Sequence, residues 1–169
     1  MWWSRRQWLA RAGTGAAVTA ATALAGCGFQ LRQPARVSFA SIALVGFAPR
    51  SPLAEELKRQ LRLQVKVLDS PDKADVVLQA LDDIRERSVV GSTSTAQVRE
   101  LQLRVKFNFR ARTPGGRELI SRAELLVSRD LSYNETAALA KAYEEAELYR
   151  EMQADVVSQV MRRLAAVVV

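Results

Sequence analysis

Cys27 is the residue whose neighbours most clearly predict a chemical reaction. It follows the small residues Ala25 and Gly26, an apolar run at about 16–24 and three arginines within the first eleven residues. This order is typical of a bacterial lipoprotein signal peptide. We therefore expect residues 1–26 to be removed, and we expect Cys27 to receive a diacylglyceryl group on its thiol and an N-acyl chain on its new α-amine.

Two other interpretations of this segment are a plain secretory signal and a transmembrane helix. The apolar run is shorter than the roughly 20 residues that span a bilayer, which argues against a membrane-spanning helix. The pair Arg5-Arg6 leaves both general secretion and twin-arginine export open. Gly28, rather than aspartate, follows the cysteine. By the sorting pattern of enteric-type lipoproteins, we expect a lipid anchor in the periplasmic leaflet of the outer membrane.

The composition excludes the commonest catalytic and metal-binding side chains. The chain contains no histidine, and Cys27 is its only cysteine. Cys-His pairs, Ser-His-Asp triads and the usual zinc ligands are therefore absent, and we assign no catalytic residue, metal or cofactor. Without residues 1–26 the chain has 143 residues, with 22 basic and 18 acidic side chains. This size is typical of one domain, and the formal charge of +4 suits an anionic partner.

A second chemical feature is a row of cations that alternates with apolar residues along one predicted strand. Its members are Arg104, Lys106, Arg110 and Arg112. Cations two residues apart on one strand face lie about 7 Å apart, so the row suits clustered phosphates or carboxylates. The other interpretation is cross-strand pairing with acidic residues on the next strand, with Arg112 opposite Glu118 and Lys106 near Glu124. Both interpretations stay open at this point.

The elements that position this row follow from the hydrophobic pattern. Apolar and polar residues alternate from Leu101 to Arg112, which predicts a strand with one buried and one polar face. The sequence at 113–117 predicts a hairpin turn. The next strand is expected to place five side chains inward: Leu119, Ala123, Leu125, Val127 and Leu131.

Two helices are also predicted. Ser51 before Pro52 is typical of a helix start, followed by an apolar face of leucines at 53, 57 and 61. Ser132 with Glu135 predicts a capping box for the second helix. Its apolar face is Leu148, Met152, Val156, Val160, Leu164 and Val167.

Further strands are expected at 37–47, 65–68 and 74–90, with a turn at 69–72 and a polar loop at 91–95. Together these elements predict an α+β fold: a single domain with a mixed, mostly antiparallel β-sheet and two α-helices packed on one face. We expect this domain to occupy residues 37–169, after a lipidated cysteine and tether at 27–36.

Several segments together resemble the LptE family of lipopolysaccharide-assembly lipoproteins. The segment 24–32, Leu-Ala-Gly-Cys-Gly-Phe-Gln-Leu-Arg, is similar to the start of the mature chain in that family. Leu57-Lys58-Arg59-Gln60-Leu61 is also similar, as are 129–134 leading into Ala138-Leu139-Ala140-Lys141, and Met161-Arg162-Arg163-Leu164. The order and spacing of these segments cover nearly all of the chain after residue 26.

The resemblance implies a non-enzymatic outer-membrane lipoprotein that binds lipopolysaccharide and forms a plug within the LptD β-barrel. The resemblance also implies that Lys141 binds lipopolysaccharide. The family's second binding cation falls at Gly91, which has no charge, so Arg85, Arg87 and Arg99 are its possible substitutes. The alternatives are an auxiliary lipoprotein of a phospholipid-transport system of ABC or MCE type, and a periplasmic hydrolase. No nucleic-acid partner is expected.

Overall fold

The computed structural model describes residues 36–168. Cys27, the expected signal peptide at 1–26 and the tether before residue 36 lie outside the described residues. The regular elements are β1 (Ser41–Val45), α2 (Pro52–Arg62), β2 (Lys66–Leu68), η1 (Pro71–Lys73), β3 (Val76–Ser92), β4 (Val98–Arg112), β5 (Glu118–Ser132), η2 (Glu135–Ala137) and α3 (Ala138–Ala165).

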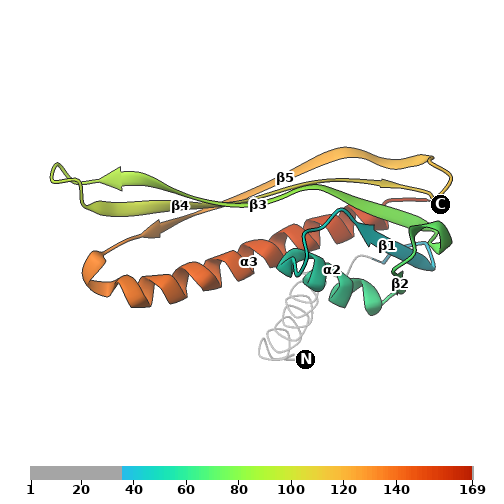
Figure 1. The fold of residues 1–169 in the computed structure, drawn as a ribbon, viewed down its shortest axis with the longest axis horizontal. Coiled ribbons are helices and arrows are strands. Elements are labelled where there is room, and N and C mark those ends of the chain that lie inside the picture. The colour runs from blue at the N-terminus through green and yellow to red at the C-terminus, as the bar shows by residue number, and fades with distance from the viewer. Residues whose placement is uncertain (1–35, 169) are drawn as a thin grey trace, which may run out of the picture. The chain divides into compact units, whose positions relative to one another are not determined.

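The five strands form one sheet in the order β2-β1-β3-β4-β5. The pairs β1/β2 and β1/β3 are parallel, whereas the long pairs β3/β4 and β4/β5 are antiparallel. Both helices lie on the same side of the sheet (Figure 1). The predicted α+β fold is confirmed. Because β1 pairs with β3 only as far as Gln79, the rest of β3 has β4 as its only strand partner among residues 36–168.

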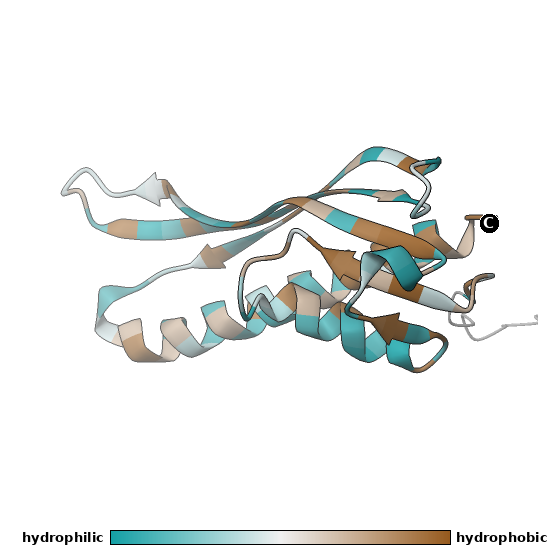
Figure 2. Ribbon diagram, turned by 45° about the vertical axis from the view of Figure 1, so that its right-hand side comes forward, coloured by the Kyte–Doolittle hydropathy of each residue, from teal (hydrophilic) through white to brown (hydrophobic). Residues whose placement is uncertain are grey.

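The core lies between the helices and the sheet. In β4, every second side chain from Leu101 to Phe109 is buried, as the sequence predicts. Phe107 stacks on Phe47 and on Phe109, with ring centroids 5.8 and 5.3 Å apart. Hydrophobic and hydrophilic segments alternate along the long strands (Figure 2). Each large apolar side chain buried in this way stabilises the fold by about 1.5–3 kcal/mol, so this layer holds the helices in place.

The helix α2 begins where the sequence predicts. The Ser51 hydroxyl accepts a hydrogen bond from the Ala54 N–H at 3.1 Å and donates one to Asp83 Oδ2 at 2.6 Å. The first bond satisfies an N–H group that the helix itself leaves unpaired. The second ties α2 to β3. The leucines at 53, 57 and 61 are buried, as expected.

The first strand is shorter than predicted, at Ser41–Val45 instead of 37–47. Its start is held by a side chain: Asp75 Oδ2 accepts hydrogen bonds from the Ser41 hydroxyl at 2.9 Å, the Ser41 N–H at 2.8 Å and the Ala40 N–H at 3.1 Å. Gly46 ends the strand with a φ of 81°, a conformation that glycine adopts readily.

The predicted polar loop at 91–95 is partly wrong. Gly91 and Ser92 belong to β3, because the ladder continues to the pair Ser92 and Val98. The remaining residues form a turn in which the Thr93 N–H donates to the Gln97 carbonyl at 2.9 Å. The long hairpin therefore extends further than its hydrophobic pattern indicates.

The predicted capping box of Ser132 and Glu135 is also wrong. Ser132 is the last residue of β5 and pairs with Glu100, so its backbone is extended. Asn134 caps η2 instead, because its side chain accepts from the Thr136 N–H at 3.1 Å. The helix α3 then runs from Ala138 to Ala165. Val167 lies past its end but is still buried.

Candidate functional site

The cations identified in the sequence lie on two surfaces of the fold. The first, which we call the distal end, comprises the turn at 93–97, the neighbouring ends of β3, β4 and β5, and the first three turns of α3 (left side of Figure 1). The second, which we call the outer face, is the side of β3, β4 and β5 opposite the two helices. Lys141 belongs to the distal end, and the row from Arg104 to Arg112 belongs to the outer face.

Lys141 lies in the first turn of α3 and reaches back to the end of β5. Its Nζ donates to Ser132 Oγ at 3.2 Å and pairs with Glu144 Oε2 at 2.7 Å. The side chain is 20% exposed and that of Glu144 is 50% exposed. A pair at positions i and i+3 of one helix contributes little free energy, so Glu144 holds Lys141 only weakly.

The three possible substitutes for the cation missing at Gly91 have different surroundings. Arg87 pairs with Glu145 of α3 at 3.5 Å, one helical turn from Lys141. The backbone carbonyl of Arg99, near the start of β4, accepts from the Tyr133 N–H at 2.8 Å, and the Arg99 guanidinium donates to the Gln97 side chain. These two arginines belong to the distal end.

Arg85 lies farther along β3. Its guanidinium carbon is 5.6 Å from the centre of the Tyr149 ring, and it donates to Gln153. The Tyr149 hydroxyl donates to the Glu86 carbonyl at 2.8 Å. Burial raises the pKa of Tyr149 above its usual value, and the charge of Glu145 adds to the rise. Arg85 is thus held by Tyr149 and Gln153 in the middle of α3, two or more helical turns from Lys141.

Exposed apolar side chains lie among the cations of the distal end. Leu139 is 73% exposed and Tyr143 is 71% exposed, both in the first turns of α3, and Val89 and Val90 of β3 are 55% and 50% exposed. Large apolar side chains exposed together beside charged groups are typical of binding surfaces. The distal end therefore has the two chemical properties that an amphiphile with anionic groups requires. The sequence pattern did not single out these four residues.

On the outer face, each cation of the predicted row is held by a neighbour. Lys106 pairs with Glu124 at 3.8 Å, as the cross-strand interpretation predicts. Arg110 donates twice to Gln79, at 2.8 and 3.0 Å, and Arg104 donates to Gln102 at 2.7 Å. Arg112 lies opposite Glu118 in the register and donates to the Thr113 carbonyl. The structure does not bring this row together with Lys141.

The outer face also contains a buried polar side chain. By the alternation along β4, Asn108 lies on the same side of the strand as the cation row. It is nevertheless fully buried, and its Nδ2 donates to Asp82 Oδ2 at 2.6 Å. Asp82 also pairs with Arg122 of β5 at 3.6 Å. On either side of Lys106, Ile84 and Leu126 are 40% and 59% exposed. The outer face is therefore a mixed polar and apolar surface with balanced charges.

Residues 36–168 contain no group of three or more acidic, cysteine or histidine side chains that could hold a metal ion. Within the same residues, no helix is both long and apolar enough to cross a membrane.

Comparisons with known proteins agree on one family. The family described as LptE, lipopolysaccharide-assembly, matches residues 39–164. A protein from Pectobacterium atrosepticum named LPS-assembly lipoprotein LptE is 30% identical over 85% of this chain and 79% of its own length. A protein of the same name from Photorhabdus laumondii has the same identity and coverage. The solution structure of lipoprotein B from Nitrosomonas europaea is 30% identical, with a TM-score of 0.71 over 82% of this chain and 91% of that one.

Proposed function

The chain belongs to the LptE family of lipopolysaccharide-assembly lipoproteins, and from this premise we propose that it is a non-enzymatic partner of the LptD β-barrel. In this proposal it binds lipopolysaccharide and forms with LptD the complex that inserts lipopolysaccharide into the outer leaflet. Residues 37–169 act as the domain that plugs the barrel. The family assignment and the chemistry of the distal end support the proposal.

We further propose that the protein is anchored to the periplasmic side of the outer membrane. The anchor consists of the diacylglyceryl group and N-acyl chain on Cys27, after removal of residues 1–26. Two or more acyl chains make such an anchoring stable, whereas one chain gives only marginal binding. The order of residues before Cys27 supports this step.

The observation that carries the lipopolysaccharide proposal is the position of Lys141 beside exposed apolar side chains. Lipopolysaccharide presents phosphates and carboxylates next to acyl chains. Lys141, with Arg87 and Arg99, supplies charge-assisted hydrogen bonds to the anionic groups. Leu139 and Tyr143 supply apolar contact area at the same end. The family's second binding cation falls at Gly91, which has no charge. We propose that Arg87 and Arg99 take its role here.

We assign the outer face to contact with the barrel wall. The row of Arg104, Lys106, Arg110 and Arg112 is bonded within the sheet and lies apart from Lys141 and its exposed apolar neighbours, so we assign it to LptD rather than to lipopolysaccharide. A polar surface with a few exposed apolar side chains resembles the usual composition of a protein interface. The phospholipid-transport alternative is not favoured, because the family and the relatives named above concern lipopolysaccharide assembly.

The proposal is tested by capture of the full-length, affinity-tagged protein from detergent-solubilised outer membranes, followed by mass spectrometry of bound proteins and lipids. We expect LptD and lipopolysaccharide to be captured together. Inner-membrane transporter subunits with phospholipid would support the alternative instead. Capture of neither the barrel nor lipopolysaccharide would refute the proposal.

Three variants separate the two surfaces in the same experiment. Lys141→Gln is expected to reduce captured lipopolysaccharide severalfold and to leave LptD unchanged. The double variant Arg104→Glu with Arg110→Glu should reduce LptD and affect lipopolysaccharide less. Lys73→Gln is the matched control, since Lys73 lies in η1, away from both surfaces. Unchanged lipopolysaccharide capture by Lys141→Gln would refute the role assigned to Lys141.

A further inference from the structure

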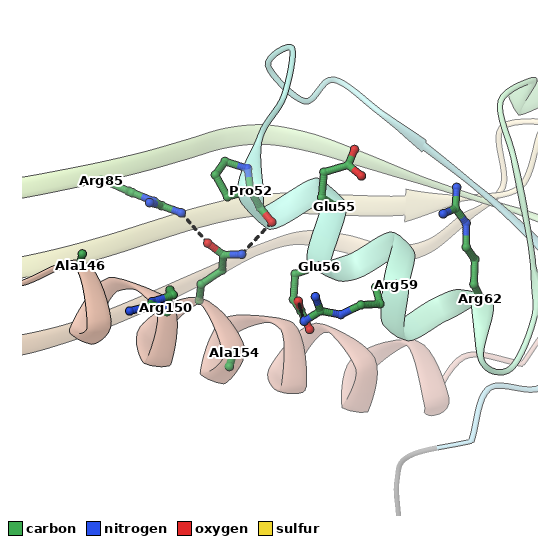
Figure 3. Close-up of a pocket in the computed structure, with 10 residues that line it drawn as sticks. Pro52, Glu55, Glu56, Arg59, Arg62, Arg85, Ala146, Arg150 and Ala154 are labelled. Carbon is green, nitrogen blue, oxygen red and sulfur yellow. Dashed lines mark hydrogen bonds and ion pairs between the residues drawn. The ribbon is translucent and has the colours of Figure 1, made fainter. Parts of the chain in front are cut away.

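A cleft of about 920 Å³ lies between α2, α3 and the part of β3 that has no strand neighbour on the β1 side (Figure 3). This volume is within the range of small-molecule sites. Its charged lining residues are four arginines and two glutamates: Arg59, Arg62, Arg85, Arg150, Glu55 and Glu56. The lining therefore has an excess of two positive charges. None of these residues belongs to the outer face or to the distal end around Lys141.

Arg85 is held in place at one end of the cleft. The Gln153 amide accepts from Arg85 and donates to the Pro52 carbonyl at 2.7 Å, so it links β3, α3 and the start of α2. Figure 3 draws these two hydrogen bonds as dashed lines between Arg85 and Pro52. The ring of Tyr149 packs against the guanidinium. An arginine fixed in this way loses little conformational entropy when it binds an anion.

The other three arginines differ in their availability to a ligand. Arg59 and Arg150 pair with Glu56 and Glu147 on their own helices, and their side chains are 72% and 71% exposed. The Arg150–Glu147 pair is exposed on both sides and contributes little free energy, whereas Glu56 is only 14% exposed and holds Arg59 more firmly. Among residues 36–168, the side chain of Arg62 has no hydrogen-bond or ion-pair partner. An incoming anion therefore meets an unpaired Arg62 and loses little by competing with Glu147 for Arg150.

The arginines are spread along the cleft instead of converging on one point. In Figure 3, Arg85 and Arg150 lie at one end, Arg59 lies beside Glu56, and Arg62 lies at the other end. The helix α2, which runs along the cleft from Pro52 to Arg62, has 11 residues and is about 16 Å long at a rise of about 1.5 Å per residue. A single phosphate is too small to contact both ends.

We propose that this cleft binds an elongated polyanion that has two or more phosphate groups. Arginine forms paired hydrogen bonds with phosphate oxygens, which makes it the usual residue for this chemistry. The phosphates come from either a phosphorylated glycolipid headgroup or a free polyphosphate. The site is independent of Lys141, so it stands even if the lipopolysaccharide proposal for the distal end fails.

Isothermal titration calorimetry tests the site, with sodium tripolyphosphate added to the full-length protein in a non-ionic detergent. We expect saturable binding that weakens between about 50 and 200 mM salt. Arg62→Gln and Arg85→Gln should each reduce the affinity about tenfold, the loss expected for one charge-assisted bond. Arg117→Gln should change it less than about twofold. Arg117 is the matched control because it lies in the turn between β4 and β5.

The outcomes separate the two sources of the phosphates. If the Arg62 and Arg85 variants also weaken binding of purified lipopolysaccharide, the ligand is the glycolipid headgroup. If only tripolyphosphate binding weakens, the ligand is a free polyphosphate. Absence of saturable tripolyphosphate binding, or an equal loss in Arg117→Gln, overturns the proposal. Arg62→Gln removes no hydrogen bond or ion pair within residues 36–168, so it keeps the test decisive even if Arg85→Gln unfolds.

Discussion

Replacement of Ser51 by alanine should destabilise the fold through the start of α2. Ser51 is 5% exposed, and its hydroxyl both caps the helix through the Ala54 N–H and donates to the Asp83 carboxylate. Loss of an N-cap costs about 1 kcal/mol, and loss of a hydrogen bond to a charged group costs about 1.5–3 kcal/mol. Because Asp83 is partly exposed and regains water, we expect a total of about 2–3 kcal/mol.

Thermal and urea denaturation followed by circular dichroism measure this loss. For a domain of this size, about 2–3 kcal/mol corresponds to a fall in Tm of about 8–12 °C, with an unchanged dependence on urea. Ser70→Ala is the matched control. Ser70 also precedes a proline at a helix start, but its side chain makes no capping hydrogen bond, so the loss should stay under about 0.5 kcal/mol. Equal losses in the two variants, or a loss under about 0.5 kcal/mol at Ser51, would refute the reasoning.

Three further measurements test other parts of the fold. Gly46→Ala should cost at least about 3 kcal/mol, because its Cβ would lie 2.4 Å from a β3 carbonyl oxygen at a φ of 81°. Gly116→Ala, at a φ of 90° in open space, should cost only about 1–2 kcal/mol. Phe107→Ala should lower the free energy of unfolding by about 3–5 kcal/mol, whereas the exposed Leu126→Ala should change it by less than about 0.5 kcal/mol. A hydroxyl and two N–H groups at the start of β1 hold the pKa of Asp75 below its usual value. This stabilisation is present above the unfolded-state pKa of about 4 and is lost as the pH falls through the folded-state value. Asp75→Asn should therefore lower Tm at pH 7, with a difference from wild type that shrinks below about pH 4; a difference that grows toward low pH would contradict this.

The fold class was predictable because its signals are local. Alternation of period two along β4 and the leucines of α2 identify the buried faces of both elements before any tertiary contact is known. The cap at Ser51 depends only on the residues that follow it. The element boundaries were less predictable. The start of β1 at Ser41 is fixed by hydrogen bonds to Asp75, which lies 34 residues away in the sequence. No local pattern around Ser41 indicates where the strand starts.

The register of β5 shows why a local pattern is insufficient. The sequence places Leu119 and Ala123 on the same inward face, but Ala123 pairs with Phe109 while Ile120, not Leu119, pairs with Ala111. The ladder is shifted there, and a shift by one residue moves the following side chains to the other face. Leu119 is accordingly only half-buried.

The sequence by itself determined the α+β class and the polar face of β4, whereas the anchor at Cys27 stays a prediction. Each of these depends on residue order over a short stretch, because backbone geometry sets the period of a strand or helix. Only the tertiary structure decided which charged groups meet. Lys141 reaches Ser132, Arg87 pairs with Glu145, and Arg62 and Arg150 line the same cleft. These juxtapositions depend on strand register and on the packing of α2 against α3, which arise from contacts between residues far apart in the chain.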